Sequence, residues 1–165
     1  IYYLARMLYA GEEPAFIARR IMICAAEDVS NADPNALVVA TAASLAVERI
    51  GMPESQIILA QAAAYVACAP KSNSAVNAIS EAMEVVGSER TASIPPYLMD
   101  AHYGGAAKLG HGIGYLYPHI YENHYVKQQY LPDELKDRVF YRLSDNGYEK
   151  KLKEYLRKLK EEERP

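Results

Sequence analysis

Four histidines, the residue type most often used to bind metals in proteins, lie within 23 residues of one another: His102, His111, His119 and His124. Their spacings of nine, eight and five residues match neither the i, i+4 pair of a helical zinc site nor a Cys/His finger. No cysteine lies near them. We therefore expect these histidines to pack among tyrosines and glycines, and a metal-dependent enzyme built on them is the least favoured function.

A glycine-rich run, residues 110–114, has the composition of a phosphate-binding loop. Such a loop leaves a strand and opens a helix, whereas this run joins residues 106–109 to a Tyr-Leu-Tyr-Pro sequence at 115–118. We predict a tight turn. No Walker A run, nucleophile elbow or paired carboxylate pattern occurs elsewhere, so the sequence indicates no catalytic residue, cofactor site or metal site.

Three basic residues are candidates for contact with nucleic acid: Arg19, Arg20 and Lys71. A net charge of −3 and a pI near 5.8 give no general attraction to a polyanion, so any such contact must be local. Because Glu27 and Asp28 follow the two arginines, we favour an interpretation in which they tie helices together. Lys71 has no such explanation.

Helices must hold these residues. Glycine and proline divide residues 1–87 into five helical segments, and the boundaries are marked by Gly11, Pro14, Asp33-Pro34, Gly51 and Pro53. At Cys68–Asn73, Pro70 ends one helix and Ser72 or Asn73 begins the next, which runs to Val86. Short loops imply antiparallel neighbours, and no segment alternates like a strand, which predicts an all-α bundle.

Two of these helices have no polar face. Residues 36–47 contain only Thr41 and Ser44 as polar residues, and residues 57–68 are almost as apolar. Such helices must be covered on every side, which is difficult for two helices in one small bundle. We therefore expect self-association through a helical face rather than a fully wrapped core. The candidate interface residues are Leu37, Val38, Leu45, Ile58, Leu59 and Tyr65.

The character of the chain changes after Gly87. Residues 88–93 are polar, Pro95-Pro96 cannot continue a helix, and nine of the 14 tyrosines lie between Tyr97 and Tyr148. We expect this region to be ordered by aromatic packing and to end in a helix with an apolar stripe. The other faces of that helix should carry solvent-exposed pairs, Glu149/Lys153, Lys150/Glu154 and Glu154/Lys158. Residues 1–87 are thus assigned to a helical oligomerisation bundle, and residues 88–165 to a smaller, irregular Tyr/Gly-rich subdomain with a C-terminal helix.

The composition is that of an intracellular globular protein. The 165 residues are 50% hydrophobic, enough to bury a core, and Cys24 and Cys68 lack the spacing of a metal clip or redox motif. The longest apolar run, residues 36–47, is shorter than the roughly 17 to 25 residues a membrane helix needs. The chain starts inside a helical pattern without methionine, so we expect part of a longer protein.

Several ordered motifs resemble one family. They are Phe16-Ile17-Ala18-Arg19-Arg20, the run 26–34 (Ala-Glu-Asp-Val-Ser-Asn-Ala-Asp-Pro), Ala69-Pro70-Lys71-Ser72-Asn73, His111-Gly112, Gly114-Tyr115, Tyr117-Pro118-His119 and Tyr130-Leu131-Pro132. In this order and spacing they are similar to the C-terminal part of the replication-associated recombination protein A family, relatives of the eukaryotic Werner-helicase-interacting protein. The resemblance covers nearly the whole chain.

The resemblance implies an AAA+ ATPase of the clamp-loader branch that acts in replication-fork maintenance, recombination and repair. Its ATP- and Mg-binding motifs precede the region present here, so this part is expected neither to bind nor to hydrolyse ATP. By this resemblance, residues up to Gly87 would form a clamp-loader-collar-like helical bundle that assembles subunits into a homo-oligomer, a tetramer. The intact protein would bind DNA and replication-fork proteins in the cytoplasm, at the nucleoid. Members often carry lysines where this chain has Ile113 and Leu116, which weakens DNA contact by that loop.

One alternative to the ATPase interpretation stays open. The helical bundle is also compatible with a stand-alone protein-interaction adaptor that binds a partner helix in an apolar groove.

Overall fold

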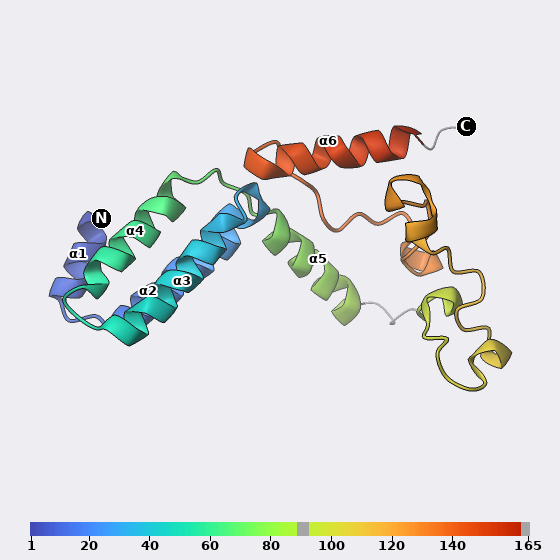
Figure 1. Cartoon of the computed structure of the whole chain (residues 1–165), viewed down its shortest axis with the longest axis horizontal. Coiled ribbons are helices and arrows are strands. Elements are labelled where there is room, and N and C mark those ends of the chain that lie inside the picture. The colour runs from blue at the N-terminus through green and yellow to red at the C-terminus, as the bar shows by residue number, and fades with distance from the viewer. Residues whose placement is uncertain (89–92, 163–165) are drawn as a thin grey trace. The chain divides into compact units, whose positions relative to one another are not determined.

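The computed structural model describes residues 1–88 and 93–162 (Figure 1). All regular structure in these residues is helical and none is strand, which confirms the all-α prediction. The α-helices are α1 (Tyr2–Tyr9), α2 (Pro14–Cys24), α3 (Asn35–Ile50), α4 (Ser55–Cys68), α5 (Ser74–Ser88) and α6 (Gly147–Glu162). None of the helices in the described residues combines the length and the hydrophobicity that crossing a lipid bilayer requires.

The first five helices are present as predicted, with small differences at some of their ends: α4 begins at Ser55, after Pro53, and α5 ends at Ser88 rather than Val86. Pro14 occupies the first position of α2, where its missing N–H costs nothing. Gly51 ends α3 with a φ of +77°, a conformation that favours glycine. Ala69 is extended (φ −65°, ψ 150°) because Pro70 follows it, and α4 stops there.

The connection from α2 to α3 is the one irregular part of the bundle that the sequence did not indicate. A single π turn (Ala25–Val29) follows α2 directly and leads into a 3₁₀ turn (Ser30–Ala32), with Ser30 at a φ of +51°. The Asp28 carbonyl oxygen accepts a hydrogen bond from the Ser72 N–H at 2.8 Å. The π turn therefore anchors the chain that leaves α4.

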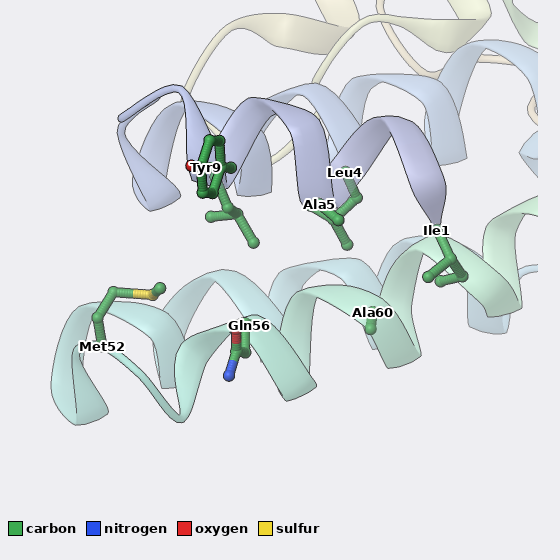
Figure 2. A pocket seen from close by; sticks show the side chains of 8 residues that line it. Ile1, Leu4, Ala5, Tyr9, Met52, Gln56 and Ala60 are labelled. Carbon is green, nitrogen blue, oxygen red and sulfur yellow. The ribbon is translucent and has the colours of Figure 1, made fainter.

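Helix α1 packs less closely than its neighbours, since none of its residues is buried. It faces α4 across an apolar pocket of about 390 Å³, lined by Leu4 and Ala5 from α1 and by Gln56 and Ala60 from α4 (Figure 2). Helix α1 thus covers α4 only in part.

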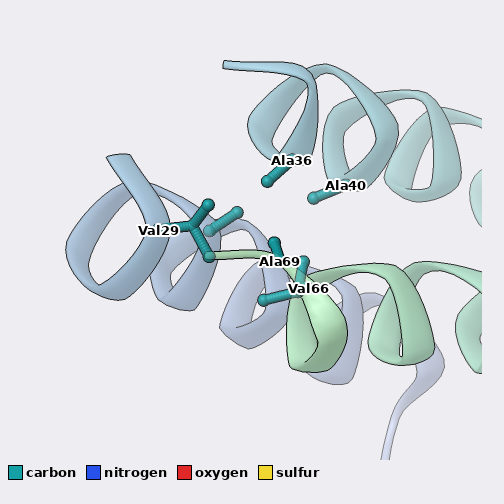
Figure 3. Close-up of a cluster of buried hydrophobic side chains, with 6 residues drawn as sticks. Val29, Ala36, Ala40, Val66 and Ala69 are labelled. Atoms are coloured by element: carbon teal, nitrogen blue, oxygen red, sulfur yellow. The ribbon is translucent and has the colours of Figure 1, made fainter. Parts of the chain in front are cut away.

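The core lies where α2, α3 and α4 meet, and it is built largely from small side chains. One cluster is shown in Figure 3 and consists of Ala25, Val29, Ala36, Ala40, Val66 and Ala69. A second cluster joins Ile17, Ala18, Val47 and Leu59. Alanines at these contacts let the helix backbones approach closely, so the three helices form a tight layer with little bulk between them.

The chain forms two compact units. The first unit comprises Ile1–Ser80 with Tyr141–Glu154, and the second comprises Glu81–Phe140 with Tyr155–Pro165. The expected boundary between residues 87 and 88 differs from this division, because residues 141–154 return to the first unit. The Asn31 amide donates to the Tyr141 hydroxyl, and the Asn146 amide donates to the Lys71 carbonyl oxygen. The network around Glu149, described below, adds further contacts.

The second unit is irregular, with short 3₁₀ turns at Pro96–Leu98, Ala106–Leu109, Pro118–Ile120, Glu122–His124 and Asp133–Leu135. Aromatic side chains contribute to its internal contacts: the Tyr97 hydroxyl donates to the carbonyl oxygen of Gln129. The glycine run forms turns, and Gly112 has a φ of +71° where an added Cβ would lie 2.5 Å from the Cβ of Ala101.

Candidate functional site

The outward face of α3 is apolar, although its opposite face already packs in the core. Val38 and Leu45 are 63% and 53% exposed, and exposed Ala42 lies between them at the i, i+4, i+7 spacing of one helical face. Leu37, beside this stripe, is 42% exposed. We call Val38, Ala42 and Leu45 the α3 stripe. The structure thus places three of the candidate interface residues on one accessible surface.

The candidates on α4 are placed differently. Leu59 is fully buried in the core, so its assignment to an interface is corrected: it packs within the unit. Ile58 is half-buried and lines a small cavity between α3 and α4. The hydroxyl of Tyr65 donates to an Asp33 carboxylate oxygen at 2.9 Å, and this bond, with partial desolvation, raises the Tyr65 pKa. On α4 the most exposed large apolar side chain is Ile57, at 67%, and Tyr65 is 37% exposed.

Sequence reasoning also missed an apolar stripe on α5. Ile79, Met83 and Val86 are each at least 60% exposed and follow the i, i+4, i+7 spacing. The spacing of these three residues is present in the sequence. The interface was predicted elsewhere because residues 36–47 and 57–68 are the helices that lack a polar face.

The two arginines of α2 have different surroundings. The Arg19 guanidinium lies 3.7 Å from the Glu13 carboxylate and over the Phe16 ring, so its contacts are with its own helix region. The expected tie from Arg19 to Glu27 and Asp28 is therefore not formed. Arg20 instead borders an apolar groove. Neither arginine is part of a basic cluster suited to a phosphate backbone.

Lys71 now has a structural explanation. Its ammonium group donates to the carbonyl oxygens of Val66 at 2.9 Å and Ala67 at 3.0 Å, and also to that of Ala69. These carbonyls belong to the C-terminal end of α4, where backbone acceptors lack partners and a positive charge is favourable. An ammonium group has three protons, and these three carbonyl oxygens accept all of them. Lys71 therefore has no donor left for a phosphate oxygen.

Glu149, on the first turn of α6, is a fully buried carboxylate, so its predicted pairing with Lys153 on a solvent-facing side of the helix is wrong. Lys153 pairs with Asp145 instead. The Glu149 carboxylate accepts hydrogen bonds from the Ser72 hydroxyl at 2.8 Å, the Tyr141 hydroxyl at 2.8 Å and the Ser144 N–H at 2.9 Å, and from the Ser74 hydroxyl. Burial acts to raise the Glu149 pKa, but hydrogen bonds from Ser144, Ser74 and Ser72 outweigh it and lower the pKa to about 2. The network fixes the start of α6 against the corner after α4.

The four histidines do not converge on one point. His102 lies 2.7 Å from a carboxylate oxygen of Asp100, and His111 contacts a tyrosine hydroxyl at 2.6 Å. His119 and His124 lie ring to ring, with centroids 5.1 Å apart. Across residues 1–88 and 93–162, no group of three or more His, Cys, Asp or Glu side chains is arranged to hold a metal ion. His111 and His119 contact the rings of Tyr103 and Tyr117, in line with the predicted packing among tyrosines, and His124 contacts the ring of His119.

The described residues thus form an all-helical module whose accessible features are apolar helix faces and one groove. The family model described as "MgsA AAA+ ATPase C terminal" matches residues 1–160. The chain therefore belongs to the family of MgsA AAA+ ATPase C-terminal domains, which confirms the resemblance found in its motifs.

Several curated relatives are similar over nearly the whole chain. An AAA domain-containing protein of Mycobacterium tuberculosis is 48% identical over 97% of this chain and 35% of its own length. Replication-associated recombination protein A of Bacillus subtilis is 44% identical over 96% of this chain and 38% of its own length. ATPase WRNIP1 of Dictyostelium discoideum is 36% identical over 85% of this chain. The chain spans little more than a third of the length of the first two relatives.

Proposed function

We propose that this chain is the assembly domain of an AAA+ ATPase that acts in replication-associated recombination, holding identical subunits together as a tetramer. The observation that carries this proposal is the α3 stripe, because the same helix already buries Ala36, Ala40, Ala43 and Val47 on its other face. Covering a large aliphatic side chain contributes about 1.5–3 kcal/mol. Contact between the stripes of two subunits would remove Val38 and Leu45 from water.

The family supports the cellular role. Relatives named replication-associated recombination protein A occur in Bacillus subtilis and Escherichia coli, and the Dictyostelium relative is named as an ATPase. In this proposal ATP and Mg bind in a module outside these residues, and the intact protein contacts DNA and replication-fork proteins in the cytoplasm, at the nucleoid. The domain itself contributes assembly rather than chemistry.

The surface proposed for assembly is more limited than the six candidates from the sequence. Leu37, Val38 and Leu45 remain in it, and Ile57 joins them as the most exposed large apolar residue of α4. Ile58 and Tyr65 are assigned to the edge of the proposed assembly surface. Ile58 is half-buried, and the Tyr65 hydroxyl is hydrogen-bonded to Asp33.

Sedimentation velocity at micromolar concentration tests this proposal. We expect the wild-type chain to form oligomers and Leu45→Glu to weaken their association at least a hundredfold, because it places a charge at the centre of an apolar contact. The matched control is Ile120→Glu, which changes a residue 76% exposed in the second unit and should leave assembly intact. A wild-type chain that sediments only as a monomer, or a Leu45→Glu variant that assembles normally, would contradict the proposal.

A further inference from the structure

An open groove of about 300 Å³ runs between α1, α2 and α4, within the first unit. Its walls are apolar and are contributed by Leu4 and Met7 of α1, Ile17 and Ile21 of α2, and Ala63 and Ala67 of α4. The volume lies at the lower end of the roughly 300–1,000 Å³ typical of ligand pockets. It suits one or two bulky apolar side chains rather than a large cofactor.

The charged residues that line this groove are both basic. Arg20 and Lys71 both line it, and its lining contains no Asp or Glu, although the chain as a whole carries a net charge of −3. The Cys24 thiol, also on the lining, donates to an Asp28 carboxylate oxygen at 3.2 Å. Two of the three basic residues that the sequence singled out therefore meet at one apolar surface.

Arg20 and Lys71 are not equivalent in this groove. Lys71 directs its protons to the carbonyls at the end of α4, so it contributes positive charge but no spare donor. For Arg20, no carboxylate of the described residues lies within ion-pair distance of its guanidinium, which has five N–H donors suited to a carboxylate. Arg20 is consequently the group able to pair with an anionic ligand at the rim.

We propose that this groove binds an acidic peptide segment of a partner protein, with a bulky apolar side chain between α1 and α4 and a carboxylate paired with Arg20. Apolar walls beside a cationic rim are complementary to a segment in which apolar and acidic residues are neighbours. A phosphate backbone is the poorer match, because nucleic-acid sites present many polar and cationic groups and this groove presents one available guanidinium.

Fluorescence anisotropy with a labelled synthetic peptide, GDELFDEG, tests the proposal on the full chain. We expect it to bind at least tenfold more tightly than GNQLFNQG, which lacks the charges, and than GDESSDEG, which lacks the apolar side chains. Arg20→Gln should weaken binding of GDELFDEG at least tenfold. Arg19→Gln is the matched control, since its side chain contacts Glu13 and Phe16, and should change the affinity less than twofold.

Four results would overturn the proposal: no binding of GDELFDEG at millimolar concentration, equal binding of the three peptides, equal effects of the two arginine variants, or preferential binding of a single-stranded oligonucleotide that depends on Arg20. Sedimentation of Arg20→Gln separates this inference from the assembly proposal. We expect unchanged oligomers, and a loss of oligomers would show that a second copy of the chain occupies the groove instead. Circular dichroism and thermal melts establish that each variant is folded.

Discussion

At the scale of single residues, the central group of the first unit is the Glu149 carboxylate. A buried charge is costly unless it is fully hydrogen-bonded, and here three hydroxyls and one backbone N–H supply the bonds. The donors are Ser72 after α4, Ser74 at the start of α5, and Tyr141 and Ser144 in the segment before α6. Glu149 therefore joins segments that are distant in sequence.

Replacing Glu149 by Gln should lower the free energy of unfolding by about 2 kcal/mol. The neutral amide oxygen accepts weaker hydrogen bonds than a carboxylate, and the amide NH2 group would face the hydroxyl and N–H donors of the network. Urea denaturation measures this change. The control is Glu161→Gln on the same helix, whose carboxylate pairs with Arg157 at the surface and should cost less than about 0.5 kcal/mol. Equal stability of the two variants would show that the buried network contributes nothing.

The same carboxylate predicts a pH dependence. Because the folded-state pKa of about 2 lies below the ordinary value of 4.5, the unfolded chain binds this proton more readily. The stabilisation is complete above pH 4.5 and is lost as the pH falls toward 2. Denaturation curves at pH 6, 4 and 3 should show wild type losing stability faster than Glu149→Gln. Parallel losses in both proteins would contradict this assignment.

Lys71 gives a second prediction at this scale. Lys71→Met leaves the last carbonyls of α4 without their cationic partner and should lower the free energy of unfolding by about 1 kcal/mol. Lys151→Met, a change at an exposed lysine of α6, should be nearly neutral. If Lys71→Met kept full stability but impaired DNA binding by the intact protein, Lys71 would be a nucleic-acid contact after all.

At the scale of elements, the helices could be predicted because their boundaries are set locally. Pro14, Gly51 and Pro70 act through their own backbone preferences, so their effects are readable without knowing the fold. The π turn at Ala25–Val29 has no such signal. It depends on contacts with the chain after α4, including the bond from the Ser72 N–H to the Asp28 carbonyl.

The candidate site was only partly predictable for a related reason. Apolar composition indicated that α3 and α4 exceed what one core can cover, but it could not say which side of each helix faces inward. Leu59 and Ile57 are two residues apart and lie on opposite sides of α4, one buried and one exposed. Helix orientation is fixed by tertiary packing, which a single sequence does not contain.

Gly147, at the start of α6, supports a prediction about how this element docks. Its φ is +51°, and an added Cβ would lie 2.1 Å from the Ala32 carbonyl oxygen and 2.7 Å from the Pro70 Cγ. Gly147→Ala should therefore lower the free energy of unfolding by more than about 2 kcal/mol. The new Cβ would displace the neighbouring backbone, and alanine would also be strained at a positive φ. Gly11→Ala also has a positive φ, +85°, but meets no atom within 4 Å and should cost only about 1 kcal/mol.

Thermal melts of the two alanine variants, followed by circular dichroism, test this difference. Gly11→Ala has only the strain of a positive φ, whereas Gly147→Ala has that strain and the close contacts with Ala32 and Pro70. Equal melting temperatures would show that α6 begins elsewhere than against Ala32 and Pro70.

At the scale of the whole molecule, the chain is two units that interleave in sequence. Residues 81–140 separate two segments of the first unit, and α6 begins in the first unit while its later residues belong to the second. No composition change marks the return at Tyr141, which explains why the sequence indicated a single boundary near Gly87. The long-range contacts of Tyr141, Asn146 and Glu149 with residues 1–80 reveal this organisation.

Hydrogen exchange followed by mass spectrometry tests the independence of the units. Glu149→Gln should accelerate exchange in residues 1–80 and 141–154, because the network that it weakens lies entirely there. Exchange in residues 93–140 should stay close to wild type, as expected for units that open separately. A uniform acceleration across the chain would show that the two units unfold as one.

The bond between Ser74 and Glu149 also dictates an order of events during protein synthesis. The two residues are 75 positions apart, so the ribosome, at about 5–20 residues per second, adds Glu149 about 4–15 s after Ser74. Throughout that interval the nascent bundle has its serine hydroxyls in place but lacks the carboxylate that binds them. The first unit therefore reaches its final form only after the intervening residues 81–140 have been translated.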